Sequence, residues 1–320
     1  MGKDLAIGVD IGGTKILAAL VSGGRRILER RKEATPADAP PAEVFAAVRA
    51  AVKGVLDDAG VRPSSLKGMG VGVPGIVDVR SGRVVSAPNI NLSGFPMGAA
   101  LRKRFRVPVA VDNDVNLAVL GEARLGAGRG VRDLVGIFPG TGIGGGVIVD
   151  GRLLRGANGA GAEVGHMKIA LKGPKCGCGN RGCLEALAGR RAIEREIRRA
   201  VKGGKRTSIK KLNKGKLGVI KSGVLRKALK RGDPVVSRVV KEAAEHLGSA
   251  CVTLRHVFDP ELFIFGGGLI EACGKYILPV VRKKMDADPF FKGLARCRVA
   301  ASELGDDAAV LGAAVLIEER

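Results

Sequence analysis

Hydrophobic residues recur in two stretches with the same pattern, each predicting three strands joined by a glycine turn and a hairpin. Residues 5–31, LAIGVDIGGTKILAALVSGGRRILERR, predict a strand, a Gly-rich turn, a second strand, a Gly-Gly hairpin and a third strand. Residues 134–154, LVGIFPGTGIGGGVIVDGRLL, repeat this order, with an Asp-Gly hairpin before the third strand. Two such units indicate an internally duplicated architecture.

Helical spacing appears between and after these units. Residues 40–60 predict an amphipathic helix that ends at Gly60, 233–258 a long helix, and 306–319 a closing helix capped by Asp306 or Asp307. Further strands are expected at 66–73, 109–112 and 261–265, two of them running into glycine turns. This mixed order predicts an α/β protein with two lobes and a cleft between them.

Composition narrows the class of protein. With 320 residues, 46% of them hydrophobic, the chain can bury a sizeable core, and its apolar runs are too short to cross a bilayer. The opening residues run directly into the first strand and carry no signal-peptide cleavage pattern, so a cytoplasmic protein is expected. Six cysteines, three of them clustered, do not form the pattern of a disulfide scaffold.

The charge is strongly positive, with 54 basic and 31 acidic residues and a net charge of +23. Such an excess favours a nucleic-acid or polyphosphate partner. One Tyr, no Trp and nine Phe leave little aromatic surface on which bases could stack, which favours a solvated basic face instead. Much of the excess lies in residues 201–233, and both interpretations stay open at this point.

Three glycine turns each follow a predicted strand: Gly12 to Thr14, Gly140 to Gly146, and Gly266 to Gly268. Glycine lets backbone N–H groups approach an anion closely, so the three together predict a nucleotide held by its phosphates. A Rossmann site is excluded because GTGIGG at 140–145 runs into a strand and GVGVPG at 70–75 contains Pro74. No P-loop motif occurs.

The segment VDNDVN, residues 111–116, lies where a strand ends and a helix begins. Asp114 or Asn113 could be the helix N-cap. Alternatively, Asp114 is a cleft carboxylate that accepts a proton from a substrate hydroxyl during phosphoryl transfer. Spacing alone does not decide between them.

A histidine and three cysteines follow in the pattern H-x9-C-x-C-x4-C. Thiolates with one imidazole favour tetrahedral Zn²⁺, and four protein ligands leave no position for water, so the metal would be structural. The alternative is a core histidine beside unrelated buried thiols. The proposed ligands are His166, Cys176, Cys178 and Cys183.

With these motifs together, the chain resembles the ROK family of sugar kinases and repressors. The resemblance runs nearly end to end, through DIGGTK, GVPG, APNI, VDNDVNLAVLGEARLGAG, GTGIGGGVIVDG, GAGAEVGHM, CGCGNRGCLEA, DPELFIFGGG and LGAAVL. It implies the two-lobed, duplicated hexokinase- and actin-like fold, of ribonuclease H type. Residues 1–112 would form a small lobe completed by the closing helix at 305–320. Residues 113–304 would form a large lobe that includes the zinc segment 166–183.

The resemblance also implies an activity, an ATP-dependent sugar kinase that phosphorylates the 6-hydroxyl of a hexose, glucose being the expected one. Asp114 would be the general base, and Asp10 would lie in the Mg²⁺-phosphate region. Expected sugar ligands are Asn89, Asn113, Asp114, Glu163, His166 and Glu185. Expected nucleotide contacts are Gly12, Gly13, Thr14, Lys15, Thr141, Gly142, Gly266, Gly267 and Gly268.

In this family the zinc would brace sugar ligands, holding His166 on one side while the chain after Cys183 delivers Glu185. Alternatives are an N-acetylglucosamine or N-acetylmannosamine kinase and a glucokinase that uses polyphosphate. The family's repressors carry a helix-turn-helix before the DIGGTK strand, which here starts within ten residues, so a regulator is not expected. No specific nucleic-acid or membrane partner is expected, and assembly as a homodimer or homotetramer is.

Overall fold

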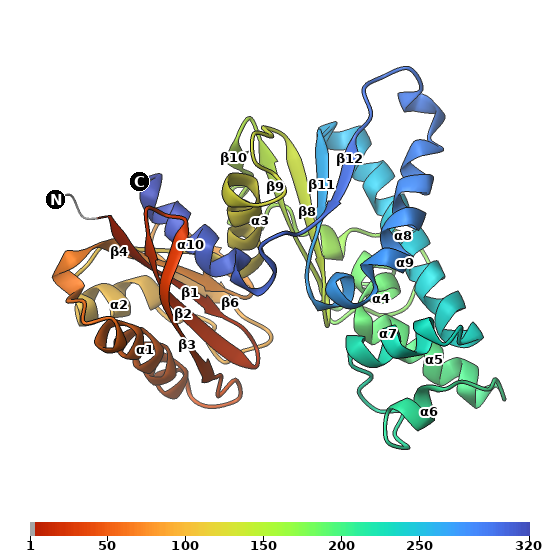
Figure 1. Ribbon diagram of the computed structural model, residues 1–320, viewed down its shortest axis with the longest axis horizontal. Helices are drawn as coiled ribbons and strands as arrows, with labels where there is room; N and C mark the ends of the chain where they lie inside the picture. The colour runs from red at the N-terminus through yellow and green to blue at the C-terminus, as the bar shows by residue number, and fades with distance from the viewer. Residues whose placement is uncertain (1–3) are drawn as a thin grey trace.

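The structure is a computed structural model that describes residues 4–320 as two lobes, each built on a five-stranded sheet (Figure 1). The strands of the first sheet are β1 (Leu5–Ile11), β2 (Lys15–Ser22), β3 (Arg26–Ala34), β4 (Leu66–Val73) and β7 (Val109–Asn113). Those of the second are β8 (Leu134–Pro139), β9 (Ile143–Val149), β10 (Arg152–Leu153), β11 (Leu262–Phe265) and β12 (Arg298–Ala301). A separate ribbon pairs β5 (Ile76–Asp78) with β6 (Arg83–Ser86).

The two sheets share one topology. Their strand orders are β3-β2-β1-β4-β7 and β10-β9-β8-β11-β12, which match position for position. In each, the first three strands are antiparallel neighbours and the last two add in parallel. Positive φ at Gly23 and Gly24, and at Asp150 and Gly151, makes the two tight hairpins. The α/β class and the duplication expected from the sequence are confirmed.

The helices divide between the two lobes and the layer that separates them. They are α1 (Pro41–Asp58), α2 (Met97–Phe105), α3 (Asp114–Leu125), α4 (Leu184–Ala188), α5 (Arg190–Lys202), α6 (Ile209–Leu212), α7 (Ser222–Lys230), α8 (Pro234–Phe258), α9 (Gly268–Asp286) and α10 (Ala308–Glu318). Gly60, at φ +63°, follows the end of α1, and Asp233 caps α8 by accepting the N–H of Val236. Short 3₁₀ turns lie at Pro63–Ser65, Val164–His166, Pro289–Phe291 and Gly305–Asp307.

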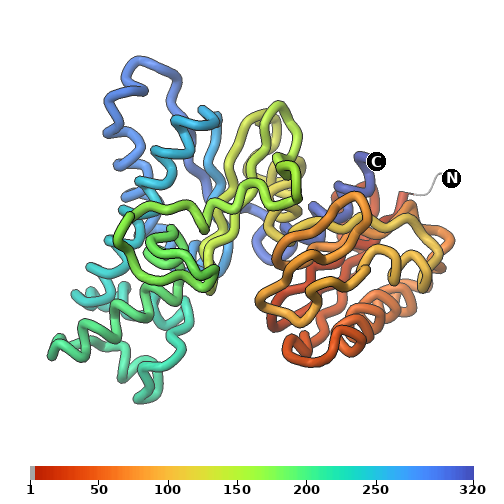
Figure 2. Tube along the Cα trace, turned by 180° about the vertical axis from the view of Figure 1, so that it is seen from behind, coloured from red at the N-terminus to blue at the C-terminus, as the bar shows by residue number. Residues whose placement is uncertain are grey.

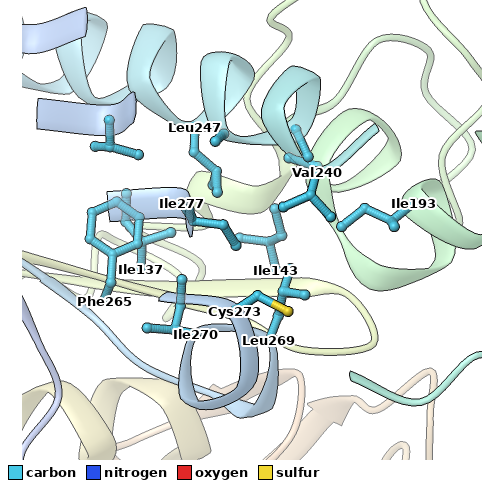
Figure 3. Close-up of a cluster of buried hydrophobic side chains, with 14 of the residues drawn as sticks. Ile137, Ile143, Ile193, Val240, Leu247, Phe265, Leu269, Ile270, Cys273 and Ile277 are labelled. Carbon is cyan, nitrogen blue, oxygen red and sulfur yellow. The ribbon is translucent and has the colours of Figure 1, made fainter. Parts of the chain in front are cut away.

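Both faces of each sheet are covered. In β1, Ile7 and Val9 pack toward the helices α1 and α2, and Gly8 lies on the opposite face beneath α10. The second sheet packs one face against α5, α7, α8 and α9, where Figure 3 shows Phe265, Leu247 and Ile277 in one buried cluster. Its other face packs against α3. The order across the molecule is therefore first sheet, α10, α3, second sheet (Figure 1).

Glycines let these central layers approach closely. A Cβ on Gly8 would lie 2.0 Å from the carbonyl oxygen of Val310, and one on Gly312 would lie 1.8 Å from that of Leu117. The closing helix thus lies backbone to backbone against both β1 and α3. Its predicted cap differs, because Asp307 precedes α10 without making a side-chain cap bond. Asp306 pairs with Lys15 and Asp307 with Arg30, so both carboxylates bond distant cations instead.

The packing of α10 on the first sheet is in keeping with a small lobe completed by residues 305–320, and we keep the division after residue 112 as a proposal. The first three residues of that lobe lie outside the described chain. All six cysteines are free thiols, as expected for a chain without a disulfide framework. Across residues 4–320, no helix combines the length and the apolarity needed to span a bilayer.

Candidate functional site

The carboxylates of Asp10 and Asp114 lie near the carboxyl ends of the parallel strands in the first sheet. In the strand register, Asp10 of β1 lies beside Gly72 of β4, which lies beside Asp112 of β7. A Cβ on Gly72 would lie 3.1 Å from the Cα of Asp114, the first residue of α3. Glycine at this position therefore leaves room for Asp114 against β4.

The carboxyl groups of Asp10 and Asp114 both have raised pKa values. Burial and the charge of Asp114 together raise the pKa of Asp10 to about 7, against the opposing effect of the charge of Lys15. Burial raises the pKa of Asp114 to about 6, an effect that a hydrogen bond from Val115 N–H opposes and the charge of Glu163 reinforces. These groups are close enough to sense one another's charge, in a region that disfavours their ionised forms.

Asn113 settles the identity of the helix cap. Its Oδ1 accepts the N–H groups of Val115 at 2.8 Å and Asn116 at 3.0 Å, which is the N-cap arrangement. Its Nδ2 donates to the carbonyl oxygen of Gly75 at 3.0 Å, tying α3 to the loop before β5. Asp114 is thus the first helical residue rather than the cap.

The first glycine turn joins β1 to β2. Gly12 N–H donates to the carbonyl oxygen of Lys15 at 2.9 Å, and the Thr35 hydroxyl donates to the oxygen of Gly12 at 2.7 Å. The Lys15 ammonium lies 2.6 Å from an Asp306 oxygen, and this hydrogen bond lowers the pKa of Asp306. Lys15 therefore bridges the turn to the start of α10. Gly13 and Thr14 complete the turn.

Asn89 lies on an exposed loop that approaches this turn. A Cβ on Gly13 would be 3.9 Å from the carbonyl oxygen of Asn89. The loop, residues 87–93, lines a surface hollow of about 370 Å³ together with Ala37 and Asp38. Asn89 is therefore placed near the first turn and at the rim of the first lobe.

The second glycine turn joins β8 to β9 and is bonded to the start of α5. Gly140 N–H donates to the oxygen of Gly142 at 2.8 Å, and Arg190 Nη2 donates to Thr141 Oγ1 at 2.8 Å. A Cβ on Gly142 would lie 2.1 Å from Glu185 Oε2. That oxygen accepts Ile143 N–H at 3.1 Å, so Glu185 lies directly against this turn.

The third turn, Gly266 to Gly268, lies between β11 and α9. A Cβ on Gly266 would meet the ring of Phe138 at 2.4 Å, and Gly267 has φ +78°. These two glycines are required by packing and by backbone conformation. Gly268 has open space around its Cβ position at the first residue of α9.

The histidine and three cysteines of the zinc segment converge. The possible ligand atoms of His166, Cys176, Cys178 and Cys183 all lie within 4.8 Å of one another. His166 Nδ1 is 3.7 Å from Cys176 Sγ, and Cys178 Sγ is 3.7 Å from Cys183 Sγ. An S₃N set gathered in this way fits a tetrahedral metal.

This cluster joins the chain that carries Glu163 to the chain that carries Glu185. Leu184 N–H, next to Cys183, donates to the oxygen of Met167, next to His166, at 2.9 Å. Burial raises the pKa of Glu163, His166 lowers it and Glu185 raises it, so these three groups face one another. Because Glu163 also acts on Asp114, the expected sugar ligands and the expected base lie in one region.

Three residues near the site were not among the site residues expected from the sequence: Arg155, Arg190 and Asp306. Arg190 bonds Thr141, Asp306 bonds Lys15, and Arg155 bonds Asp112. Asp306 pairs across 291 positions, and no local pattern predicts such a contact. Arg190 alone had a usable signal, because it begins a helix just after the zinc segment.

Comparison with known proteins places the chain in a family. A profile described as the ROK family matches residues 6–320. A glucokinase of Thermotoga maritima is 36% identical, with 100% of this chain and 99% of that protein covered. A xylose repressor of Caldicellulosiruptor bescii is 33% identical over 80% of this chain and 63% of that protein.

Among solved structures, a ROK family glucokinase from Streptomyces griseus in complex with glucose and AMPPNP superposes with a TM-score of 0.86 at 35% identity. The match covers 99% of this chain and 100% of that chain. The fold is therefore the two-lobed hexokinase- and actin-like fold, and the chain belongs to the ROK family.

Proposed function

We propose that this chain is an ATP-dependent glucokinase, which transfers the γ-phosphoryl group of ATP to the 6-hydroxyl of glucose. The observation that carries the proposal is Asp114, a partly buried carboxylate with a pKa of about 6 beside Asp10 and Glu163. A carboxylate of this pKa is deprotonated at neutral pH and still basic enough to accept a hydroxyl proton. The full-length likeness to glucokinases supports the same activity.

In the proposed reaction, Asp114 orients the sugar's 6-hydroxyl and accepts its proton as the oxygen attacks the γ-phosphorus. A new O–P bond forms, the bond between the γ-phosphorus and the β,γ-bridging oxygen breaks, and ADP leaves. Asn113, held as the helix cap, keeps Asp114 at the helix start and has one Nδ2 proton beyond its bond to Gly75. Closure of the two lobes would exclude water, which competes with the sugar as acceptor.

The remaining sugar ligands would be Asn89, Glu163, His166 and Glu185. Glu163, His166 and Glu185 lie on the two chain segments that meet at the metal cluster, so they would bind hydroxyl groups as one unit. A site with several such polar groups discriminates strongly against sugars that leave them unpaired. We infer from the S₃N ligand set that the metal is Zn²⁺ and that it braces this unit without taking part in the reaction.

The phosphates of ATP would lie between the first two glycine turns. Backbone N–H groups of Gly12 to Thr14 and of Thr141 and Gly142, with Lys15, would face them, and Gly266 to Gly268 would lie beside the adenosine. Mg²⁺ bound with ATP supplies positive charge that stabilises the transferred group. Asp10 fits this role, because burial and the charge of Asp114 raise its pKa, and a cation bound there would offset both effects. We place the enzyme in the cytoplasm, where ATP is available, and expect a homodimer or homotetramer.

The test is kcat/KM for glucose, mannose, fructose, N-acetylglucosamine and N-acetylmannosamine, with ATP and again with polyphosphate. We expect glucose with ATP to give the highest value. A tenfold advantage for an N-acetylated sugar, about 1.4 kcal/mol of transition-state free energy, would replace glucokinase with an N-acetylhexosamine kinase. A higher value with polyphosphate would change the donor, and no turnover of any hexose would refute the kinase.

A further inference from the structure

We propose that Arg155 is a positioning residue that fixes the base Asp114 relative to the sugar ligand Glu163. The inference rests on the proposed function and adds a residue to which no role was assigned. Arg155 follows β10 in the second lobe and begins a loop, residues 155–161, that leads to Glu163. Figure 2 shows this yellow-green segment extending toward the first lobe.

The side chain of Arg155 holds the end of β7. Its Nε donates to Asp112 Oδ2 at 2.7 Å, and Asp112 is only 2% exposed. The other oxygen of Asp112 accepts Asn113 N–H at 2.8 Å and Asn116 Nδ2 at 3.2 Å. Asp112 therefore links Arg155 to Asn113 and Asn116, which flank Asp114 in the sequence.

Among the described residues 4–320, Asp112 has one cationic partner, Arg155. The other groups that donate to Asp112 in this part of the chain are neutral, namely the N–H of Asn113 and the side-chain amide of Asn116. A buried carboxylate that loses its cation is strongly unfavourable, so the chain around it would shift to reach water or another donor. The residues that would shift are those that cap and begin α3.

The backbone of Arg155 stabilises the loop that leads to Glu163. Its carbonyl oxygen accepts Gly161 N–H at 2.9 Å, which closes the loop two residues before Glu163. Within the loop, Gly159 has φ +71°, and a Cβ there would lie 2.3 Å from the oxygen of Val77 in β5. The loop of the second lobe is thus packed against the first.

Together these contacts connect the two lobes in a continuous ring of neighbouring residues. Asn113 bonds the oxygen of Gly75, the next strand β5 packs against Gly159, and the loop returns to Arg155, which bonds Asp112. Asp114 follows Asn113 directly, Glu163 lies two residues after Gly161, and the charge of Glu163 acts on Asp114. Breaking the Arg155 link should let the two carboxylates move apart, and displacements near 1 Å can reduce a rate by about 10²-fold.

The main variant is Arg155→Met, which keeps the aliphatic length and removes the charge. We expect kcat/KM for glucose to fall by about 10- to 100-fold, with a higher glucose KM and an ATP KM within about twofold of wild type. Arg155→Lys keeps a cation near Asp112 and should retain more activity than Arg155→Met. Arg132→Met is the control and should behave as wild type. Arg132 pairs with Asp150, in the hairpin between β9 and β10 that precedes Arg155, but its side chain is 73% exposed.

A double variant separates positioning from stability. Asp112→Asn combined with Arg155→Met removes the unpaired buried charge and keeps the acceptor for Asn113 N–H, so Tm should recover relative to Arg155→Met alone. Under the proposal, kcat/KM for glucose stays low, because the link between the lobes is still absent. If Arg155→Met fails to fold, the double variant still allows the activity to be measured, because it carries no unpaired buried charge at position 112.

Two results would overturn the proposal. One is near-normal kcat/KM and glucose KM in Arg155→Met, and the other is recovery of kcat/KM together with Tm in the double variant. A wild-type enzyme that phosphorylates no hexose would instead refute the proposed function. In that case glucose binding by calorimetry, compared between wild type and Arg155→Met, still tests the positioning role.

Discussion

Asp10 and Asp114 are neighbouring carboxylates whose pKa values differ from ordinary ones for the same first reason, burial. Asp10 also senses Asp114, Lys15 and Asp306, so its charge depends on what binds at the first glycine turn. Asp114 senses Glu163 and accepts a backbone N–H bond, so its charge depends on what binds beside Glu163. Two similar residues can therefore serve the nucleotide and the sugar separately.

Asp114→Asn should lower kcat by about 10²-fold or more, because the amide keeps the size and the acceptor for Val115 N–H but cannot accept a proton. The dissociation constant for glucose should change by only a few fold. Coupled ADP-release assays and calorimetry measure the two quantities. Asp57→Asn, on the surface of α1, is the control and should leave both unchanged.

The pH profile gives the same prediction a second readout. Asp114 must be deprotonated to accept the hydroxyl proton, so wild-type kcat/KM should fall as pH drops through about 6. Asp114→Asn should lack this acidic limb. Wild-type turnover in the purified, folded Asn variant, or an unchanged acidic limb, would show that another group is the base.

The sequence left open whether Asn113 or Asp114 caps the helix α3, and the structure decides this. Asn113 and Asp114 both have side chains that cap helices well, so propensity cannot rank them. The backbone decides, since Asn113 has φ −64° and ψ 141° and Asp114 is already helical. Asn113 was expected to bind sugar, and it also caps α3 and bonds Gly75, two contacts that depend on its folded surroundings.

Secondary-structure elements show where prediction from sequence works. The two strand-turn-strand-hairpin units were predictable because their signals, glycine turns between alternating apolar residues, are local. The zinc segment was predictable for the same reason, since its ligand types lie within 18 residues. The helix α9 lacked such a signal, as it starts in three glycines and contains Pro279, which favours helix ends over helix interiors.

Contacts between distant elements could not be predicted in this way. The pairing of Lys15 with Asp306 depends on α10 returning to the first sheet, and that of Arg155 with Asp112 on a loop crossing between lobes. Neither has a sequence spacing that a motif could capture. The sequence indicated which residue types bear the chemistry, whereas the contacts that orient them arise only from tertiary packing.

The crossing of α3 and α10 provides a test of packing. Gly312→Ala would place a Cβ 1.8 Å from a backbone oxygen of α3, so one helix must move, and we expect a loss of about 1–3 kcal/mol of stability. Gly223→Ala in α7 is the matched control, because nothing lies within 4 Å of its Cβ position, and alanine there should be neutral or stabilising by up to about 1 kcal/mol. Thermal unfolding compares them. Equal Tm values for the two variants would contradict the close approach.

The metal cluster provides a second test at this scale. We expect one Zn²⁺ per chain by mass spectrometry, and its loss in Cys178→Ser. Because the cluster joins the segments that carry Glu163 and Glu185, the glucose KM should rise while the ATP KM changes little. Cys273→Ser alters a buried thiol elsewhere in the second lobe (Figure 3) and should keep the metal. A fully active protein without zinc would rule out the brace.

At the scale of the whole molecule, duplication accounts for the paired turns. In chain order, each sheet begins with two antiparallel strands joined by a glycine turn, at Gly12 to Thr14 in the first sheet and at Gly140 to Gly142 in the second. The helices α10 and α3 occupy the layer between the sheets, one packed on each (Figure 1). Under the proposed function, one structural unit used twice would therefore supply both of the glycine turns that face the phosphates of a single nucleotide.

The net charge of +23 is concentrated on one part of this molecule. Residues 190–232, which include α5, α6 and α7, contain 17 basic and two acidic residues. The two acidic residues, Glu194 and Glu196, already pair with arginines of α5. The remaining basic side chains of this segment form an electrostatic surface that attracts polyanions by charge and without sequence selectivity.

This surface should bind duplex DNA weakly, because its lysines and arginines can neutralise phosphates but the chain offers few aromatic residues for stacking. Fluorescence anisotropy with two unrelated duplexes should give equal affinities, falling by orders of magnitude between about 50 and 200 mM salt. Replacing Lys210 of α6 with Glu should weaken binding more than Lys103→Glu on α2 in the other lobe, since Lys210 lies within the basic stretch and Lys103 does not. A clear preference for one duplex at physiological salt would contradict this prediction and would indicate a specific nucleic-acid partner.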